Sequence, residues 1–168
     1  MLDIIKNYED IKNSIKSKLE NKNNTVPPKI IAVSKTFNLE KILPLINYGH
    51  LDFGENKVQE AVNKWSDVKT TYKNIKLHLI GKLQTNKVKN VIPLFDYIHS
   101  LDSIKLAKKI SEEQLKQNRN VKVFLQINIG DEIQKSGSKL SNLDELVDAC
   151  KKMKLNVIGL MCLPPFGE

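Results

Sequence analysis

The chain has 168 residues, of which 40% are hydrophobic and 27% are charged, and it carries a formal net charge of +8 at pH 7. This length and composition predict one soluble globular domain over 1–168, so we expect no second domain, and no run of about 18 apolar residues is present to span a membrane. The N-terminus carries acidic residues early and lacks the order of a secretory signal, so we expect a cytoplasmic protein.

The first predicted element is an amphipathic helix over 2–20. Apolar residues recur there at the spacing of one helical stripe, with lysines and asparagines on the other side. A polar segment follows and ends at Pro27 and Pro28, which indicates a loop that leads into the first strand.

The stretch 29–37, K-I-I-A-V-S-K-T-F, contains the first predicted strand. It holds four apolar residues in a row, three of them β-branched, and such a run favours a strand buried on both faces. Asn38 caps a helix predicted from residue 39, Pro44 is expected to bend this helix or confine regular structure to its ends, and Gly49 terminates it. Lys35 therefore lies where a parallel strand meets its helix, the edge at which barrels and open α/β sheets bind ligands.

The rest of the chain predicts a regular alternation of strands and helices. We expect strands over 51–54, 75–80, 94–99, 121–129 and 156–163, and helices over 58–65, 83–91, 104–115 and 143–150. Asp102 or Ser103 can cap the third of these helices, and Ser141 with Asp144 resembles a capping box that opens the last.

Six strands that alternate with helices indicate βαβ units, and hence a parallel sheet with right-handed crossovers. The fold class is therefore α/β, with the βα units beginning near residue 29. A (β/α)₈ barrel needs two strands more than this chain supplies.

Polar residues recur at the predicted strand ends, namely Asn56, His78, Gly81, Ser100, Asp102 and Asn128. Taken singly, they also suit ordinary roles as helix caps, turns and strand terminators. The segment 135–137, K-S-G, is expected to be a solvated loop placed to reach the same edge. His78 and His99 lie in apolar strands as core histidines, and Cys150 and Cys162 suit small buried hydrophobes rather than a disulfide or metal site. No hydrolase elbow, Walker loop or dinucleotide-binding motif is present.

Taken together, these segments resemble the pyridoxal phosphate homeostasis proteins, a family that shares its barrel with the N-terminal domain of alanine racemase. The resemblance covers about 28–165 and is carried by seven segments in the family's order: A-V-S-K-T at 32–36, F-G-E-N-x-x-Q-E at 53–60, H-L-I-G-x-L-Q-x-N-K at 78–87, S-L-D-S at 100–103, Q-I-N-I-G at 126–130, K-S-G at 135–137 and G-L-M-x-x-P at 159–164.

The resemblance implies the first six βα units of a TIM-type barrel, with an extra N-terminal helix. It implies that Lys35 forms the covalent aldimine with pyridoxal 5′-phosphate (PLP), where desolvation at an apolar mouth favours the uncharged amine. The pocket around the ring would be lined by Asn56, His78, Ile80, Gly81, Ser100, Asn128 and Met161.

The resemblance also implies a role. The family is not known for catalytic turnover, so PLP would be held accessibly, as a buffer, and passed to PLP-dependent apo-enzymes. Related racemases take an acid-base group from a second domain across a dimer. Intact relatives would be monomeric.

The chain departs from the family at its end and at one turn. Relatives continue through two more βα units that hold the phosphate, so the resemblance implies a C-terminally truncated barrel with two open, association-prone edges. Lys82 stands where many relatives have proline.

Other functions stay open on the sequence alone. One is a barrel fragment of a PLP-dependent racemase or amino-acid decarboxylase, and another is a gene remnant without activity. The lysine excess suits an anionic ligand and could equally suit nucleic acid. Because aromatic and basic residues do not interleave, we expect no nucleic-acid partner.

Overall fold

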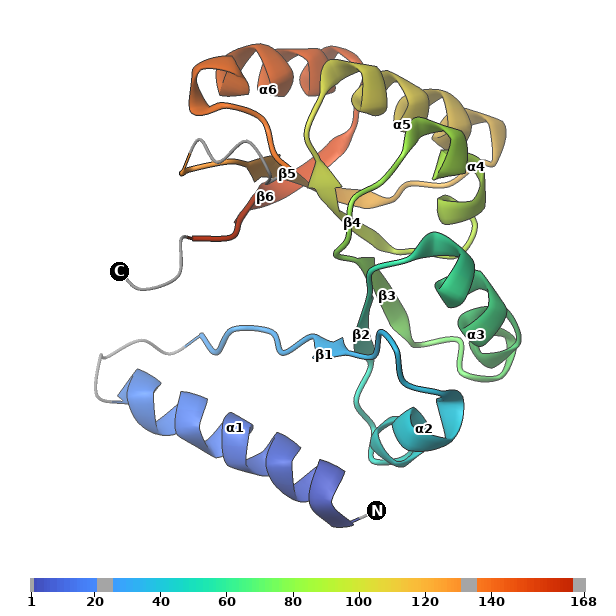
Figure 1. Cartoon of the computed structure of the whole chain (residues 1–168), viewed down its shortest axis with the longest axis vertical. Helices are drawn as coiled ribbons and strands as arrows, with labels where there is room; N and C mark the ends of the chain where they lie inside the picture. Colours follow the sequence, from blue (N-terminus) through green and yellow to red (C-terminus); the bar gives the residue numbers. More distant parts are fainter. Residues whose placement is uncertain (1, 21–25, 131–135, 165–168) are drawn as a thin grey trace.

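The structure is a computed structural model that describes residues 2–20, 26–130 and 136–164. Figure 1 shows its helices and strands, which follow one another in the order α1 (Leu2–Glu20), β1 (Ala32–Val33), α2 (Leu39–Asn47), β2 (Asp52–Glu55), α3 (Val58–Thr71), β3 (Lys76–Leu79), α4 (Val88–Val91), β4 (Tyr97–Leu101), α5 (Ile104–Lys116), β5 (Lys122–Ile127), α6 (Leu143–Lys152) and β6 (Asn156–Cys162). Two 3₁₀ turns, Thr85–Lys87 and Leu140–Asn142, precede α4 and α6.

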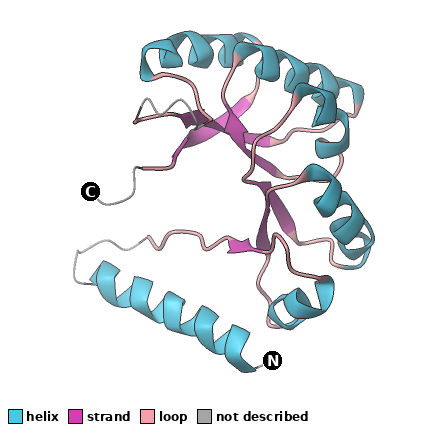
Figure 2. Ribbon diagram, viewed as in Figure 1, coloured by secondary structure: helices cyan, strands magenta, loops and turns pink. Residues whose placement is uncertain are grey.

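The strands form one curved parallel sheet in the order β1-β2-β3-β4-β5-β6. Helices α2 to α6 lie along its outer side, and its concave side faces away from them (Figures 1 and 2). The expected α/β fold with six parallel strands is thus confirmed. Among the described residues, β1 and β6 are separate edges and do not pair with each other, so a closed barrel is not seen.

The core lies between the outer face of the strands and the helices. Strand residues alternate between two faces, and the outward ones pack against the helices. On β2, for example, Phe53 is fully buried, and its ring centroid lies 5.1 Å from that of Trp65 on α3. The inward residues, such as Gly54 and Asn56, line the concave side and are the ones available to a ligand.

Several predicted helix boundaries are confirmed. The N-terminal helix spans Leu2–Glu20 as expected. Asn38 Oδ1 accepts a hydrogen bond from Lys41 N and caps α2, Ser103 Oγ accepts one from Leu106 N and caps α5, and Gly49 follows α2 with a φ of +98°. Helix α2 continues through Pro44, so regular structure is not confined to its ends.

The predicted first strand is wrong in its length and burial. Only Ala32 and Val33 are paired as a strand, and the Val33 side chain is 46% exposed. The reason is that β1 has a neighbour, β2, on one side only, so no second strand packs beside it.

Three further expectations need correction. The helix expected over 83–91 is a 3₁₀ turn followed by the single turn α4. The amides of Leu94 and Phe95 donate hydrogen bonds to Val91 O, so β4 begins at Tyr97 and not at the predicted residue 94. The capping box fails because Ser141 Oγ lies 3.1 Å from Asn142 Oδ1 instead of capping α6. Cys150 is buried, but Cys162 is exposed because it lies at the edge strand β6.

Within the described part of the chain, no helix is long and apolar enough to cross a membrane.

Candidate functional site

Lys35 lies on a short turn between β1 and α2, here called the Lys35 turn (residues 34–37). Ser34 is buried, and its amide donates to Gly54 O on β2 at 2.9 Å. Lys35 itself is exposed, and its side chain makes no hydrogen bond or ion pair with the described residues. The expected desolvation of its amine is therefore not found, because β1 is an edge strand and leaves this corner of the sheet open to solvent.

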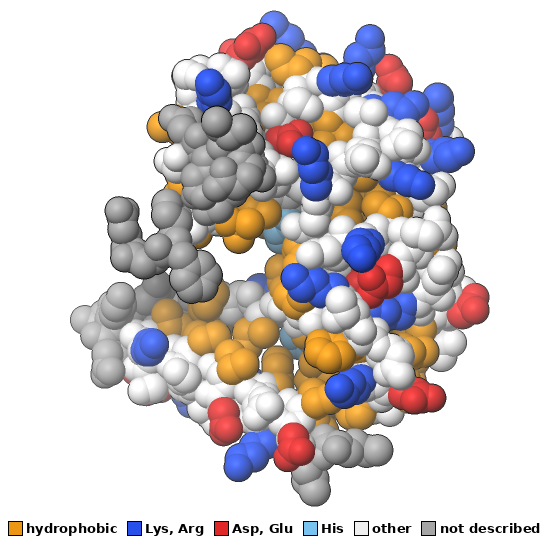
Figure 3. Space-filling model, viewed as in Figure 1, with side chains coloured by type: hydrophobic (Ala, Val, Ile, Leu, Met, Phe, Trp, Pro, Cys, Tyr) orange, Lys and Arg blue, Asp and Glu red, His pale blue; other side chains and the backbone are white. Residues whose placement is uncertain are grey.

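A polar pocket of about 310 Å³ lies at the carboxyl ends of the central strands. This strand-end pocket is lined by amide, hydroxyl and amine groups together with apolar side chains: Asn56, Ile80, Gly81, Lys82, Gln126, Ile127, Asn128, Ser136, Met161 and Leu163. In the view of Figure 3 the molecule is hollowed near its centre, with hydrophobic side chains and histidine at the margin.

The pocket unites five of the eight predicted site residues. Asn56, Ile80, Gly81, Asn128 and Met161 all contribute to its lining, whereas Lys35, His78 and Ser100 do not. Lys35 lies on the turn after the edge strand β1, and His78 lies two residues before Ile80, nearer the amino end of β3. Ser100 is buried beside the register shift of β4, and among the described residues its Oγ has no hydrogen-bond partner.

Close backbone approaches shape the pocket. A Cβ on Gly81 would lie 2.3 Å from Asn56 O, so only glycine allows the ends of β2 and β3 to meet there. The segment 136–138 folds back onto β5, with Ser138 N donating to Gln126 O at 2.8 Å and Asn128 N donating to Ser138 O at 2.9 Å. This segment was expected to be a solvated loop, yet Ser136 lines the pocket; Lys135 lies outside the described residues.

A histidine cluster formed by Asp52, His78 and His99 lies on the concave face. His78 Nε2 is 3.0 Å from Asp52 Oδ1, and His78 Nδ1 is 2.9 Å from His99 Nε2. Asp52 Oδ1 accepts the hydrogen bond that His78 donates from Nε2–H, so Nδ1 of a neutral His78 accepts a hydrogen bond from Nε2–H of His99. Both rings also stack, His78 on Tyr97 and His99 on Phe124. Both rings are buried and hydrogen-bonded, as predicted for satisfied histidines, but they lie on the concave face and not in the core beneath the helices.

The protonation states in this cluster follow from burial. Desolvation lowers the pKa of His99 to about 4 and also lowers that of His78, so both rings are neutral at pH 7. Burial raises the pKa of Asp52, but hydrogen bonds from His78 and Lys29 outweigh it and hold the pKa below the usual range. No group of three metal-ligating side chains is found among the residues that the structure describes.

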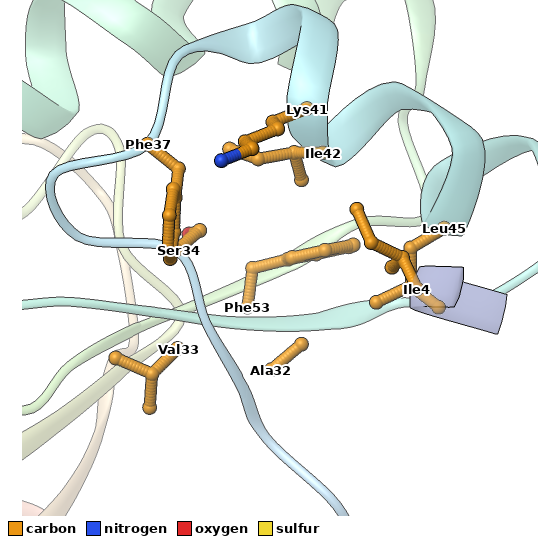
Figure 4. A pocket seen from close by; sticks show the side chains of 9 residues that line it. All are labelled: Ile4, Ala32, Val33, Ser34, Phe37, Lys41, Ile42, Leu45 and Phe53. Atoms are coloured by element: carbon orange, nitrogen blue, oxygen red, sulfur yellow. The ribbon is translucent and has the colours of Figure 1, made fainter. Parts of the chain in front are cut away.

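An apolar pocket of about 270 Å³ lies beside the Lys35 turn, between α1, β1 and α2 (Figure 4). Phe37, Phe53 and Ile4 border the same space, and the Lys41 amine lies 5.0 Å from the centre of the Phe37 ring. Ser34 and Phe37 of the turn line this apolar pocket, but it shares no lining residue with the strand-end pocket.

Sequence reasoning missed several residues of the site. Gln126 lines the strand-end pocket, and the alternation of β5 could have found it, since it shares a face with Asn128. Lys82 also lines this pocket, but the sequence singled it out only because many relatives have proline at that turn. Glu55 and Glu60, both inside the quoted segment 53–60, contact the Lys35 turn, as does Lys64 on α3. No local pattern indicates those contacts, because they join residues up to 30 positions apart.

The chain matches the family model described as "Alanine racemase, N-terminal domain" over residues 11–167. It is 39% identical over 137 residues to the pyridoxal phosphate homeostasis protein of Buchnera aphidicola, covering 81% of this chain and 59% of the relative. The curated relatives that it matches include the protein of that name from Escherichia coli at 37% identity, and the chain spans about three fifths of their length.

Solved structures give the same similarity. PipY of Synechococcus elongatus PCC7942, solved without PLP and with PLP bound, matches with TM-scores of 0.78 and 0.77 at 32% and 31% identity; the former covers 92% of this chain and 73% of PipY. Alanine racemase of Clostridium difficile 630 matches with a TM-score of 0.64 at 15% identity over 80% of this chain and 35% of the racemase, which shows likeness of fold alone.

Proposed function

The chain belongs to the alanine racemase N-terminal domain family, together with the pyridoxal phosphate homeostasis proteins, and from that membership we propose that it binds PLP in intracellular PLP homeostasis. In this proposal Lys35 holds PLP as a Schiff base without catalytic turnover, within one barrel-type domain in the cytoplasm. The observation that carries the proposal is the strand-end pocket, since it gathers five of the residues that the family resemblance assigns to the cofactor.

The chemistry of the lining fits PLP, which combines a flat apolar ring with polar substituents and an anionic phosphate. Ile80 and Met161 offer apolar contacts, the amides of Asn56 and Asn128 offer hydrogen bonds, and Lys82 offers a positive charge. The Ser100 hydroxyl, which has no hydrogen-bond partner within the described part of the chain, is a further polar group near these strand ends. When bound, PLP supplies an aldehyde carbon that a primary amine attacks.

The residues of this chain would bind and orient the cofactor rather than move protons. The amides in the lining do not titrate near neutral pH, and they suit holding a ligand in place. Lys35 is exposed, so its amine is reachable from solvent. A cofactor held at such a residue is accessible to water and to other proteins, which supports transfer to PLP-dependent apo-enzymes as the role of the site.

The experiment is to mix the purified chain with PLP, reduce with borohydride and map the modified lysines by peptide mass. We expect the Lys35 peptide to carry more label than any other, because the proposal requires the aldehyde of a cofactor held at the strand ends to come within reach of the Lys35 amine. Lys35→Ala should remove that label without its return elsewhere at similar yield.

Lys82→Ala is the matched control, since it removes another exposed amine at the same edge of the sheet. It should weaken labelling yet leave Lys35 as the preferred position. Label spread over many lysines, and unchanged by Lys35→Ala, would refute the proposed site.

A further inference from the structure

The Lys35 turn takes its shape from polar contacts rather than from packing. Residues 35–37 are exposed, and the apolar pocket of about 270 Å³ lies behind Ser34 and Phe37 (Figure 4). Little side-chain packing therefore supports the backbone that carries Lys35. Its orientation depends on hydrogen bonds: one lies within the turn, from Phe37 N to Ser34 O at 3.3 Å, and the others come from neighbouring elements.

The first set of these contacts comes from β2. Ser34 Oγ donates to Glu55 Oε1 at 2.8 Å, and the Glu55 side chain is fully buried. Trp65 Nε1 donates to the same oxygen at 2.9 Å, which fixes the carboxylate against α3. Ser34 is thus hydrogen-bonded to a buried carboxylate oxygen that Trp65 also contacts.

The second set comes from α3. Lys64 Nζ donates to Ser34 O at 2.8 Å and to Glu55 Oε1 at 2.9 Å, and its side chain is only 8% exposed. Glu60, one helical turn earlier, accepts a hydrogen bond from Thr36 N at 2.7 Å and lies 3.5 Å from Lys64 Nζ. The residues on both sides of Lys35 are therefore bonded to side chains four positions apart on one helix.

The backbone next to Lys35 is strained. Thr36 has a φ of +66°, in the left-handed region that a β-branched residue rarely adopts. Such conformations persist only where the surroundings hold them. The hydrogen bond from Thr36 N lowers the pKa of Glu60, and the charge of Lys64 lowers it further, so the Glu60 carboxylate is ionised near neutral pH and the bond is charge-assisted.

We propose that Glu60 and Lys64 are positioning residues for Lys35. They hold the backbone on either side of Lys35, and so fix the direction in which its side chain points from the edge of the sheet. This inference rests on the proposed function for its consequence, the selective reaction of Lys35. Whether Glu60 holds the turn can be tested without PLP, because the hydrogen bond to Glu60 should slow hydrogen exchange of the Thr36 amide.

The test compares Glu60→Ala with Glu60→Gln by two measurements, hydrogen exchange of the Thr36 amide and the share of borohydride-trapped PLP on Lys35. Alanine removes the acceptor, so exchange should quicken by about tenfold, the factor that a charge-assisted hydrogen bond contributes. The Lys35 share of the label should fall as the turn loosens. Glutamine keeps an acceptor oxygen and should restore most of both.

Asp67→Ala is the control, because Asp67 is an exposed carboxylate on the same helix, seven positions from Glu60. It should leave both measurements unchanged. The inference is overturned if Glu60→Ala leaves Thr36 exchange as in the wild type, or if Glu60→Gln behaves like Glu60→Ala in both. If the wild type shows no preference for Lys35, the proposed cofactor site fails, and the Thr36 amide alone decides whether the turn is clamped.

Discussion

At the scale of single residues, the histidine cluster places two neutral imidazoles beside one carboxylate on the concave face. Acidification should affect His99 more than His78, because burial and the neighbouring His78 lower the pKa of His99 from 6.5 to about 4. In the unfolded chain this ring takes up a proton near its ordinary pKa, whereas in the folded chain it resists protonation. The unfolded state therefore binds more protons between these two values.

The sign of the pH dependence follows directly. A group whose pKa is lowered by folding contributes stability that is present above the unfolded pKa and is lost as the pH falls through the folded one. We expect the free energy of unfolding to drop between pH 6.5 and about 4, and His99 to account for at most about 3 kcal/mol of that drop. Urea denaturation at pH 7 and pH 4.5 measures it.

His99→Gln isolates this contribution, since an amide can still donate to His78 Nδ1 but does not titrate. The variant should be less stable than the wild type at pH 7, yet lose less stability on acidification. Equal losses in the two proteins would show that His99 is not the source of the pH dependence.

At the scale of elements, the contact between the ends of β2 and β3 decides the form of the strand-end pocket. A Cβ on Gly81 would lie 2.3 Å from Asn56 O and 2.8 Å from Asn56 Cα, and backbone atoms do not move aside as a flexible side chain would. Gly81→Ala should therefore destabilise the chain by about 1–3 kcal/mol, the usual range for overpacking. Urea denaturation at pH 7 is the measurement.

Gly159→Ala is the matched control on β6. Its Cβ would meet only the Phe124 ring, at 3.3 Å, and a ring can shift. This variant should lower the free energy of unfolding by less than Gly81→Ala does, and it should leave PLP labelling of Lys35 closer to that of the wild type. If both variants lower the free energy of unfolding equally, the close approach of the β2 and β3 ends does not constrain residue 81.

The helices and strands also show which parts of the fold can be predicted from the sequence. Hydrophobic periodicity and capping residues such as Asn38 are local signals, and they placed the six strands and most helices. Burial of β1 was mispredicted because the sequence does not show which strand lies at an edge. Glu60 and Lys64 were missed as contacts of the Lys35 turn for a related reason, since only the folded crossover brings α3 beside that turn.

At the scale of the whole molecule, the described sheet has two edges, β1 and β6. Among the described residues β1 and β6 each pair with one neighbour, and no described helix follows β6 to cover its outer face. Ile158, Leu160 and Cys162 alternate along that face and are all exposed. Edges with free backbone groups and apolar side chains favour pairing with another chain.

We therefore predict that the chain associates as its concentration rises, and that Leu160→Lys reduces this association. The Leu160 side chain is 57% exposed, so the substitution gives up little burial while placing a charge on the edge strand, which disfavours edge-to-edge pairing. Sedimentation velocity over a range of concentrations measures the change.

The control is Leu115→Lys, which adds the same charge at an 81% exposed leucine on helix α5, away from both edges. A general effect of charge on solubility would move both variants alike, because the net charge of +8 rises equally in each. An effect of the edge strand moves only Leu160→Lys. A wild-type chain that stays monomeric at every concentration and melts cooperatively would contradict the prediction, and would mean that the curvature of the sheet already protects its edges.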